Sequence, residues 1–362
     1  MNRIFACTAA RFALLALCFW SFSSNALPLS EAVPAAQTAG PSLDDASIIE
    51  LRQQLLDGTL SPQTLTQYFL TRIAKLDQAG PRVNSVTEIN PDALKIADRL
   101  GAEPEGVART QALYSIPILI KNNIDTGDHM LTTAGSLALM GAPASQDATL
   151  VAKLRVAGAV ILGKANLSEW ANFRSSHSTS GWSGQGGLTH NPYVLNRNAC
   201  GSSSGPAAAV AAGFATVAIG TETDGSIVCP SAVNGVVGIK PTVGLVSRAG
   251  IIPISHSQDT AGPIARSVAD AAAVLTVIAG TDPRDPATVD AYKHATDYTR
   301  FLNAGSLKGK RIGVVRALAG YDPNVDHILD HAIAVLRARG AVVIDPVEIP
   351  HLNDYSKDEM TV

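Results

Sequence analysis

This sequence of 362 residues has no large excess of positive or negative charge, few cysteines and few long apolar runs. The 28 lysines and arginines nearly balance the 31 aspartates and glutamates, which leaves a formal net charge of −3. The basic residues are scattered, so the sequence lacks the basic stripe with which nucleic-acid-binding proteins contact phosphates. We therefore expect no nucleic-acid partner. With 46% hydrophobic residues, the chain is nonetheless able to bury a large core.

The N-terminal segment carries the longest apolar run without a charge or a proline. Arg3 and Arg11 flank the run 12–22, and Ser24-Asn25-Ala26 puts small residues at the positions of a signal-peptidase site. The run is shorter than the ~20 residues that cross a bilayer, which favours a cleaved signal peptide over a membrane anchor. We predict a signal peptide over residues 1–26. The protein is then expected to be periplasmic or secreted, with no stable membrane insertion after cleavage.

Residues 27–43 are rich in Ala, Pro and Ser and are predicted to be a linker, and one folded domain is predicted over residues 44–362. Loss of the signal peptide would remove two of the four cysteines and leave Cys200 and Cys229. A single pair is not a disulfide framework, and a domain of this size needs none. Two buried free thiols are the simpler interpretation, and a local disulfide in an oxidising compartment is the alternative.

The predicted domain begins with helix signals. Asp44 or Asp45 is predicted to cap a helix that ends at Gly58, and Ser61-Pro62 and Asn90-Pro91 supply the starts of two more. Apolar strands then alternate with helices. The predicted strands cover residues 113–120, 160–162, 311–315 and 341–344, and the predicted helices between them include 148–157 and 325–339. This alternation indicates an α/β fold whose sheet is mostly parallel or mixed and covered on both faces.

Three segments carry candidate chemistry. Ser202 lies in Cys200-Gly201-Ser202-Ser203-Ser204-Gly205-Pro206, and Ser226 lies 24 residues later in Thr221-Glu222-Thr223-Asp224-Gly225-Ser226-Ile227. Upstream, Lys121 ends the apolar run 116–120. These segments, in this order, resemble the amidase signature family of serine hydrolases, which cut linear amide bonds with a Ser-Ser-Lys triad. The resemblance implies an α/β/α sandwich with a large mixed sheet and helices on both faces.

The resemblance also implies a role for each residue. Ser226 would be the nucleophile, Ser202 the bridging serine that adopts a cis peptide in the family, and Lys121 the neutral base. A lysine that follows buried residues is desolvated, which lowers its pKa and frees its lone pair. The backbone N–H groups of residues Thr223, Asp224, Gly225 and Ser226 are expected to form the oxyanion hole. The implied mechanism needs no metal and no organic cofactor, and the sequence does not indicate which residues bind the substrate.

Each segment alone has a simpler explanation. A serine in a glycine-containing turn is usually structural, a lysine at a strand end is usually exposed, and Ser202 would equally cap the alanine-rich helix that follows it. A metal-dependent amidase would need clustered ligands. The helical pair His327 and His331 shares one face, but it is better explained as solvated, because no zinc-binding helix motif accompanies it. The order of the three segments is what favours the serine hydrolase.

Departures from the usual family pattern point to a branch. Val228 stands where the family turn usually has arginine, and Asp224 stands where it usually has glycine. Segments 169–174 and 244–263 resemble bacterial peptide amidases, which remove the C-terminal amide of peptides to give an acid and ammonia. A general aliphatic or aryl acylamidase is the alternative within the family. Family members are commonly longer, so the domain is expected to be incomplete at its C-terminus, and an inactive truncated member acting as a binding protein is a further alternative.

Overall fold

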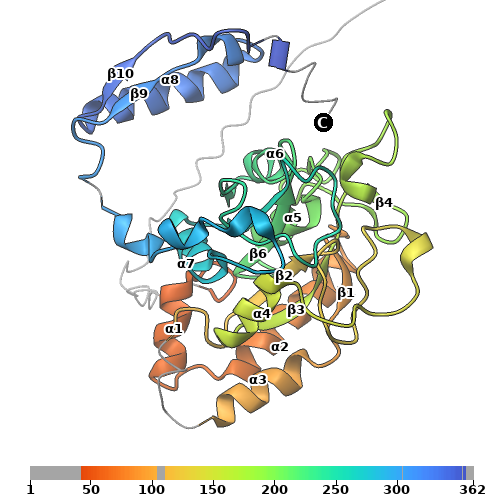
Figure 1. Cartoon of the computed structure of the whole chain (residues 1–362). Helices are drawn as coiled ribbons and strands as arrows, with labels where there is room; N and C mark the ends of the chain where they lie inside the picture. The colour runs from red at the N-terminus through yellow and green to blue at the C-terminus, as the bar shows by residue number, and fades with distance from the viewer. Residues whose placement is uncertain (1–41, 104–110, 304, 353, 356–362) are drawn as a thin grey trace, which may run out of the picture. The chain divides into compact units, whose positions relative to one another are not determined.

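The computed structural model describes residues 42–103, 111–303, 305–352 and 354–355 (Figure 1). The predicted signal peptide, and the predicted linker up to residue 41, lie outside these residues. No helix among them is long and apolar enough to cross a bilayer. Their helices are α1 (Ile48–Leu56), α2 (Pro62–Arg72), α3 (Ala93–Ala102), α4 (Thr149–Val156), α5 (Ser204–Ala211), α6 (Val228–Val233), α7 (Val268–Ile278) and α8 (Pro323–Ala338). The strands are β1 (Val86–Ile89), β2 (Pro117–Lys121), β3 (Val160–Ala165), β4 (Trp182–Ser183), β5 (Gly187–Leu188), β6 (Val217–Glu222), β7 (Val237–Gly238), β8 (Thr260–Ala265), β9 (Arg311–Gly313) and β10 (Val342–Ile344).

Helix α1 begins at a different residue from the one predicted. Its N-cap is Ser47, whose side chain accepts from the Glu50 N–H while the Glu50 carboxylate accepts from the Ser47 N–H. This reciprocal capping box satisfies two backbone donors at once. Asp44 instead accepts a hydrogen bond from Tyr68 Oη at 2.6 Å and pairs with Arg72 at 3.1 Å. The predicted start at Ser61-Pro62 is confirmed by α2, whereas α3 begins at Ala93 with Asp92 as its N-cap, two residues after the predicted cap Asn90.

Six strands form the main sheet in the order β1-β3-β2-β6-β8-β7. The central strands β3, β2 and β6 are parallel, whereas β1, β8 and β7 pair antiparallel with their neighbours. The predicted mixed sheet is therefore confirmed. Because β2 and β6 are adjacent and parallel, their carboxyl ends, which carry Lys121 and Glu222, lie at the same edge of the sheet.

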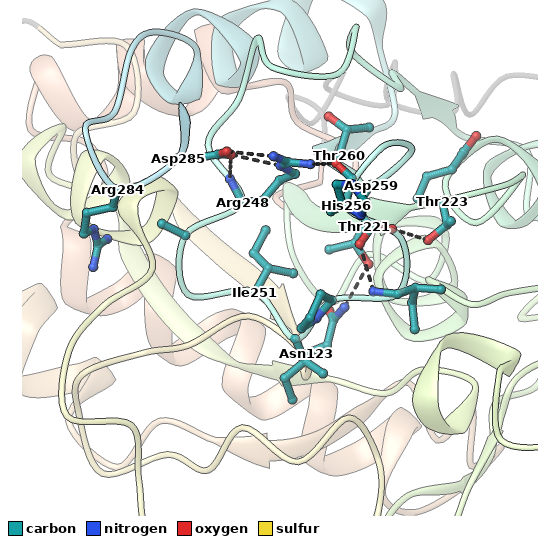
Figure 2. Close-up of a pocket in the computed structure, with 15 residues that line it drawn as sticks. Asn123, Thr221, Thr223, Arg248, Ile251, His256, Asp259, Thr260, Arg284 and Asp285 are labelled. Carbon is teal, nitrogen blue, oxygen red and sulfur yellow. Dashed lines mark hydrogen bonds and ion pairs between the residues drawn. The ribbon is translucent and has the colours of Figure 1, made fainter. Parts of the chain in front are cut away.

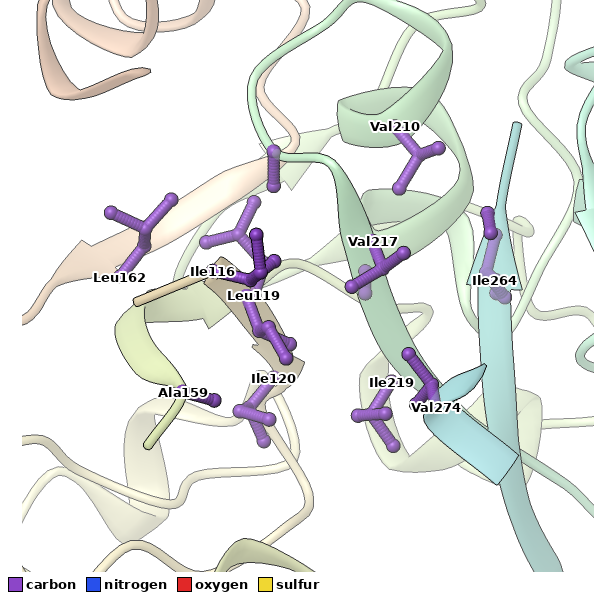
Figure 3. Close-up of a cluster of buried hydrophobic side chains, with 14 of the residues drawn as sticks. Ile116, Leu119, Ile120, Ala159, Leu162, Val210, Val217, Ile219, Ile264 and Val274 are labelled. Atoms are coloured by element: carbon purple, nitrogen blue, oxygen red, sulfur yellow. The ribbon is translucent and has the colours of Figure 1, made fainter. Parts of the chain in front are cut away.

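The core lies on both faces of this sheet. Every residue of β2, β3, β6 and β8 is buried, which requires cover on each side. Helix α5 contacts β2, β3, β6 and β8, and helix α7 contacts β8. In Figure 3, Val210 of α5 and Val274 of α7 lie with Leu119 of β2 and Val217 of β6 in one hydrophobic cluster. Burying one such side chain contributes about 1.5–3 kcal/mol, so this cluster fixes the strands that carry the candidate site.

The C-terminal strands, which the sequence predicts as part of the strand–helix alternation, form a separate two-stranded sheet. Strands β9 and β10 pair in parallel with each other, and α8 contacts β10. The predicted elements exist, but Ile333 is the one buried residue of α8, and β9 and β10 have no fully buried residue. An apolar pattern predicts a strand or a helix, but burial also requires a partner surface.

Candidate active site

Lys121 lies at the carboxyl end of β2 with its side chain fully buried. Its Nζ donates to Ser202 Oγ at 2.8 Å, to Thr221 Oγ1 at 2.8 Å and to the Thr221 carbonyl at 3.2 Å. Burial lowers the pKa of Lys121 from its ordinary value of 10.5 to about 7, although the negative charges of Glu222 and Asp259 oppose this shift. Near neutral pH a substantial share of the amine is therefore neutral, with a lone pair able to accept a proton from Ser202.

Ser202 is buried immediately before α5, and its peptide bond with Gly201 is cis. Its carbonyl accepts from the Ser168 N–H at 3.1 Å, which ties this segment to the chain that follows β3. Gly205 allows the segment to approach that chain closely. A Cβ on Gly205 would lie 2.4 Å from the Asn166 backbone and the Ser85 carbonyl, so only glycine fits there.

Ser226 lies on the turn that joins β6 to α6, and it is buried. Gly225, just before it, has a φ of 74°, which glycine adopts without strain. The Glu222 carboxylate accepts from the N–H groups of Ile227 at 2.6 Å and Val228 at 2.9 Å. This contact ties the turn that carries Ser226 to the end of β6.

The segments of the two candidate serines touch through the backbone. The Ser203 N–H donates to the Ser226 carbonyl at 3.0 Å. Ser203 Oγ donates to the Thr221 carbonyl at 3.0 Å, so Thr221 contacts both Ser203 and Lys121. The structure thus brings Lys121 and Ser202 into direct contact and places the Ser226 turn beside them.

The candidate oxyanion hole has backbone donors without partners. Among the described residues, no hydrogen bond uses the N–H groups of Asp224, Gly225 or Ser226. Asp224 is exposed and Thr223 is partly exposed, with Thr223 Oγ1 donating to Asp259 at 2.6 Å. Unpaired N–H groups on one tight turn are what a developing oxyanion requires, although their catalytic use remains a prediction.

A cavity of about 180 Å³ lies next to this cluster (Figure 2). Asn123 and Thr221 line it, and Asn123 Nδ2 donates to Thr221 Oγ1 at 3.0 Å. The buried Asn123 Oδ1 and Thr260 Oγ1 have no hydrogen-bond partner among the described residues. The rest of the lining comes from residues 222–223, 248–249, 251–254, 256, 259–260 and 284–285.

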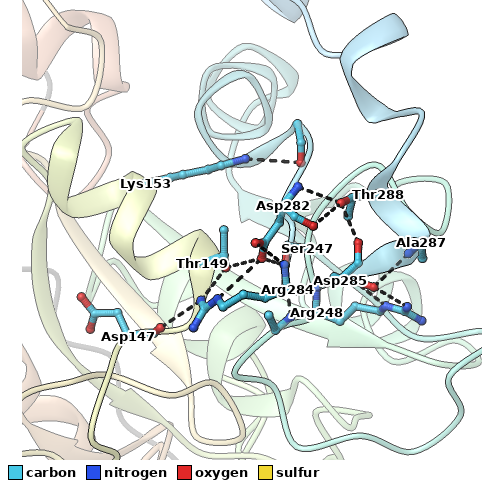
Figure 4. A network of polar contacts seen from close by, with 12 residues as sticks. Asp147, Thr149, Lys153, Ser247, Arg248, Asp282, Arg284, Asp285, Ala287 and Thr288 are labelled. Carbon is cyan, nitrogen blue, oxygen red and sulfur yellow. Dashed lines mark hydrogen bonds and ion pairs between the residues drawn. The ribbon is translucent and has the colours of Figure 1, made fainter.

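The loop that forms one wall of this cavity is fixed by charged contacts. Arg248 donates twice to Asp285 through its side chain, at 2.7 and 2.9 Å, and its backbone N–H donates to the same carboxylate at 2.8 Å. Figure 4 shows this pair beside Asp282, which accepts from Ser247 Oγ at 2.5 Å and also from Thr149. Asp259 accepts from two backbone N–H groups farther along the same loop. These hydrogen bonds and the ion pair together fix the position of the wall.

Three residues of the site escaped sequence reasoning. Thr221 and Glu222 are the last two residues of β6, just before the turn that carries Ser226, and Asp259 comes 33 residues after Ser226. Thr221 supplies two acceptors to Lys121, and the two carboxylates set its electrostatic environment. Thr221 and Glu222 lie inside the sequence segment that contains Ser226, and Asp259 lies in the segment 244–263. That location could have indicated their role, because residues next to a buried cation often balance its charge.

The two cysteines form a disulfide between Cys200 and Cys229. This outcome corrects the simpler interpretation of two free thiols and agrees with the alternative left open. The described residues contain no group of three or more His, Cys, Asp or Glu side chains arranged to hold a metal ion. His327 and His331 are both exposed on α8, as the solvated interpretation predicted.

The sequence of the chain is similar to those of known proteins. Residues 64–359 match the Amidase family. A probable amidase of Arabidopsis thaliana is 45% identical over 316 residues, covering 86% of this chain and 60% of the relative. A putative amidase of Schizosaccharomyces pombe is 40% identical over 342 residues, covering 93% of this chain and 57% of the relative.

The chain is also similar to solved structures. The native peptide amidase of Stenotrophomonas maltophilia is 53% identical, with a TM-score of 0.82, and the match covers 88% of this chain and 65% of that chain. A peptide amidase bound to the competitive inhibitor chymostatin is also 53% identical, with a TM-score of 0.83. The chain thus spans about 60% of the length of the plant relative and about 65% of the solved peptide amidases.

Proposed function

The chain belongs to the amidase signature family, and on that basis we propose that the protein hydrolyses linear carboxamides to an acid and ammonia through a serine acyl-enzyme. The observation that carries this proposal is the 2.8 Å contact between Lys121 Nζ and Ser202 Oγ, with the lysine fully buried at a pKa of about 7. Lys164 is also buried with a lowered pKa, so it is the contact with Ser202, beside the Ser226 turn, that distinguishes Lys121.

The proposed path moves one proton along three side chains. Ser226 Oγ passes its proton to Ser202 Oγ while the proton of Ser202 passes to neutral Lys121 Nζ. Ser226 attacks the carbonyl carbon, and the N–H groups of Thr223, Asp224, Gly225 and Ser226 receive the oxyanion. The proton then returns through Ser202 to the departing nitrogen, which leaves as ammonia. Water repeats the path and releases the acid.

We further propose that the substrate is the C-terminal amide of a peptide. The similarity to peptide amidases supports this, since 53% identity extends over most of the chain. Asp224 also supports it, because its exposed side chain lies two residues before the nucleophile. A carboxylate at that place repels a free C-terminal carboxylate and accepts hydrogen bonds from a neutral amide end.

Ammonia release tests the proposal on a panel of amidated peptides, the matching free-acid peptides and simple amides. We expect release from the amidated peptides in preference to all others. In the Asp224→Asn variant, inhibition by the free-acid peptide should strengthen, while the amidated peptide should still be cleaved. A clear preference for simple amides would leave a general acylamidase. Absence of release by folded protein on the whole panel would leave at most a binding role.

Export is a separate proposal, supported by the charged start, the apolar run and the small residues before Leu27. We propose a periplasmic or secreted protein whose mature chain begins at Leu27. N-terminal sequencing of the protein recovered from the periplasm or the medium checks this. Recovery of the chain in the cytoplasm with Met1 intact would contradict it.

A further inference from the structure

We propose that the Cys200–Cys229 disulfide is a positioning device for catalysis, which holds the segment of the relay serine against the segment of the nucleophile. The inference rests on the proposed function, because it assigns a role to the disulfide through Ser202 and Ser226. Cys200 comes two residues before Ser202, and Cys229 comes three residues after Ser226. The bond therefore links the two catalytic segments themselves.

The chain before Cys200 is exposed over six residues, although Ala199 itself is buried. Residues 193–198 are all exposed, and the Cys200 N–H donates to Asn198 Oδ1 within the same exposed stretch. On the other side of the bond, α6 is a helix of six residues in which Val228 and Val233 are about half exposed. A short, partly exposed helix gains little from burial, so its position depends on its individual links.

Few other links join these two segments. The Ser203 N–H donates to the Ser226 carbonyl at 3.0 Å, and Asn234 Nδ2 donates to the Ala199 carbonyl at 2.9 Å. Each such hydrogen bond contributes only about 0.5–1.5 kcal/mol net. Lys121 differs, because it belongs to a fully buried strand. The disulfide thus joins two partly exposed residues that flank the buried serines Ser202 and Ser226.

Opening the bond is a defined chemical step. A water-soluble phosphine donates two electrons to the disulfide, water supplies two protons and one oxygen, and the products are two thiols and the phosphine oxide. Both cysteines are partly exposed, so a small reductant reaches them. A displacement of about 1 Å costs about 10²-fold in rate, so we expect kcat to fall about tenfold to a hundredfold on reduction. KM should change less than twofold.

The test compares oxidised, phosphine-reduced and reoxidised protein, assayed well below the melting temperature of the reduced form. Thiol titration establishes that the bond is open. Reoxidation should restore kcat. The Cys200→Ser/Cys229→Ser double variant is the matched control: its kcat should equal that of the reduced protein and should not respond to the phosphine. A role in stability alone would lower the melting temperature and leave kcat unchanged.

Hydrogen exchange supplies a readout that does not need activity. On reduction, exchange at the N–H groups of Ser203 and Cys229 should accelerate at least tenfold, whereas exchange at residues 118–120 of β2 should not change. An unchanged kcat in reduced, active protein would overturn the inference, and so would unchanged exchange at Ser203 and Cys229. If oxidised protein releases no ammonia from any amide, the proposed function fails, and the exchange measurement alone decides the positioning role.

Discussion

Strands β2 and β3 consist entirely of buried residues, whereas the central residue of β9 and of β10 is only partly buried and the others are exposed. The sequence patterns of β2, β3 and β10 are alike, since each is a short run rich in Val, Ile or Leu, whereas β9 has Ile312 between Arg311 and Gly313. The difference lies in the surroundings. The main sheet has helices against it and forms one core, while β9, β10 and α8 pack mainly on one another.

The two regions also reverse the usual rule that charged side chains are exposed and apolar side chains are buried. Lys121, a cation, is 0% exposed in the sheet region, whereas Ile328 of α8 is 68% exposed. Burying the amine costs free energy, and the cost appears as its lowered pKa. Burial in the sheet region therefore serves the site as well as stability. The exposed apolar residues of α8 have no such consequence for Lys121.

Substitutions in the two regions should differ most in their effect on amide turnover. Ser226→Ala and Lys121→Ala are each expected to lower amide turnover by about 10³-fold or more, because loss of a triad member leaves only binding and oxyanion stabilisation. Ser202→Ala should cost a comparable factor, since it cuts the proton path. Ile328→Ala, the matched change in α8, should alter turnover less than twofold. Steady-state assays on variants shown to be folded check this, and near-normal turnover by Ser226→Ala would refute the assignment.

The pH dependence of kcat/KM should report the buried lysine. Activity needs neutral Lys121, so it should rise as pH increases through about 7, the pKa of that group, and then level off. Asp259→Asn removes a negative charge that favours the protonated amine, so the rise should shift to lower pH. A pH–rate profile of both proteins is the measurement. A rise centred near 10.5, the ordinary pKa of lysine, would contradict the assigned environment.

Stability should depend on pH for the same reason. Burial lowers the pKa of Lys121 to about 7 and that of Lys164 to about 8, both below the ordinary 10.5. The unfolded chain therefore binds more protons than the folded one between pH 7 and 10.5, and the free energy of unfolding rises with pH across that window. Each unit of difference is worth about 1.4 kcal/mol per group. Lys121→Met should reduce the slope, as measured by urea unfolding at several pH values.

Matched isoleucines should differ in what they contribute to stability. Ile118→Ala in β2 is expected to lower the free energy of unfolding by about 2–5 kcal/mol, because it leaves a cavity in the core. Ile328→Ala in α8 should change it by less than about 0.5 kcal/mol. Ile333→Ala, the buried position of the same helix, should lie between them. Denaturant titrations decide this, and equal costs at positions 118 and 328 would mean that Ile328 is covered in solution.

The smallest expected effect concerns association. Val325 and Ile328 present exposed apolar surface on α8, and such patches favour self-association at high concentration. Val325→Lys/Ile328→Lys should lower the apparent mass at high concentration while changing the free energy of unfolding by less than about 0.5 kcal/mol per site. Light scattering over a concentration series is the measurement. An apparent mass that is the same for both proteins would show that this surface does not associate.

Much of the secondary structure followed from local patterns. The start of α2, the buried run of β2 and the strand–helix alternation were predicted, because caps and apolar periodicity act within a few residues. The cap of α1 was wrong because Ser47 and Glu50 bond reciprocally, an arrangement that outcompetes an aspartate three residues earlier. Lys121 and Ser202 were also predicted, and the structure places them in contact.

The sequence by itself determined the family, the types of the elements and the candidate residues, because these are written in local composition and ordered motifs. Tertiary structure decided that Cys200 bonds to Cys229, that Thr221 contacts Lys121, and that β9 and β10 stay outside the main sheet. Lys121 meets its partners 81 and 100 positions away. The physical reason is that burial, a lowered pKa and a partner surface are set by atoms close in space and distant along the chain, which no local pattern records.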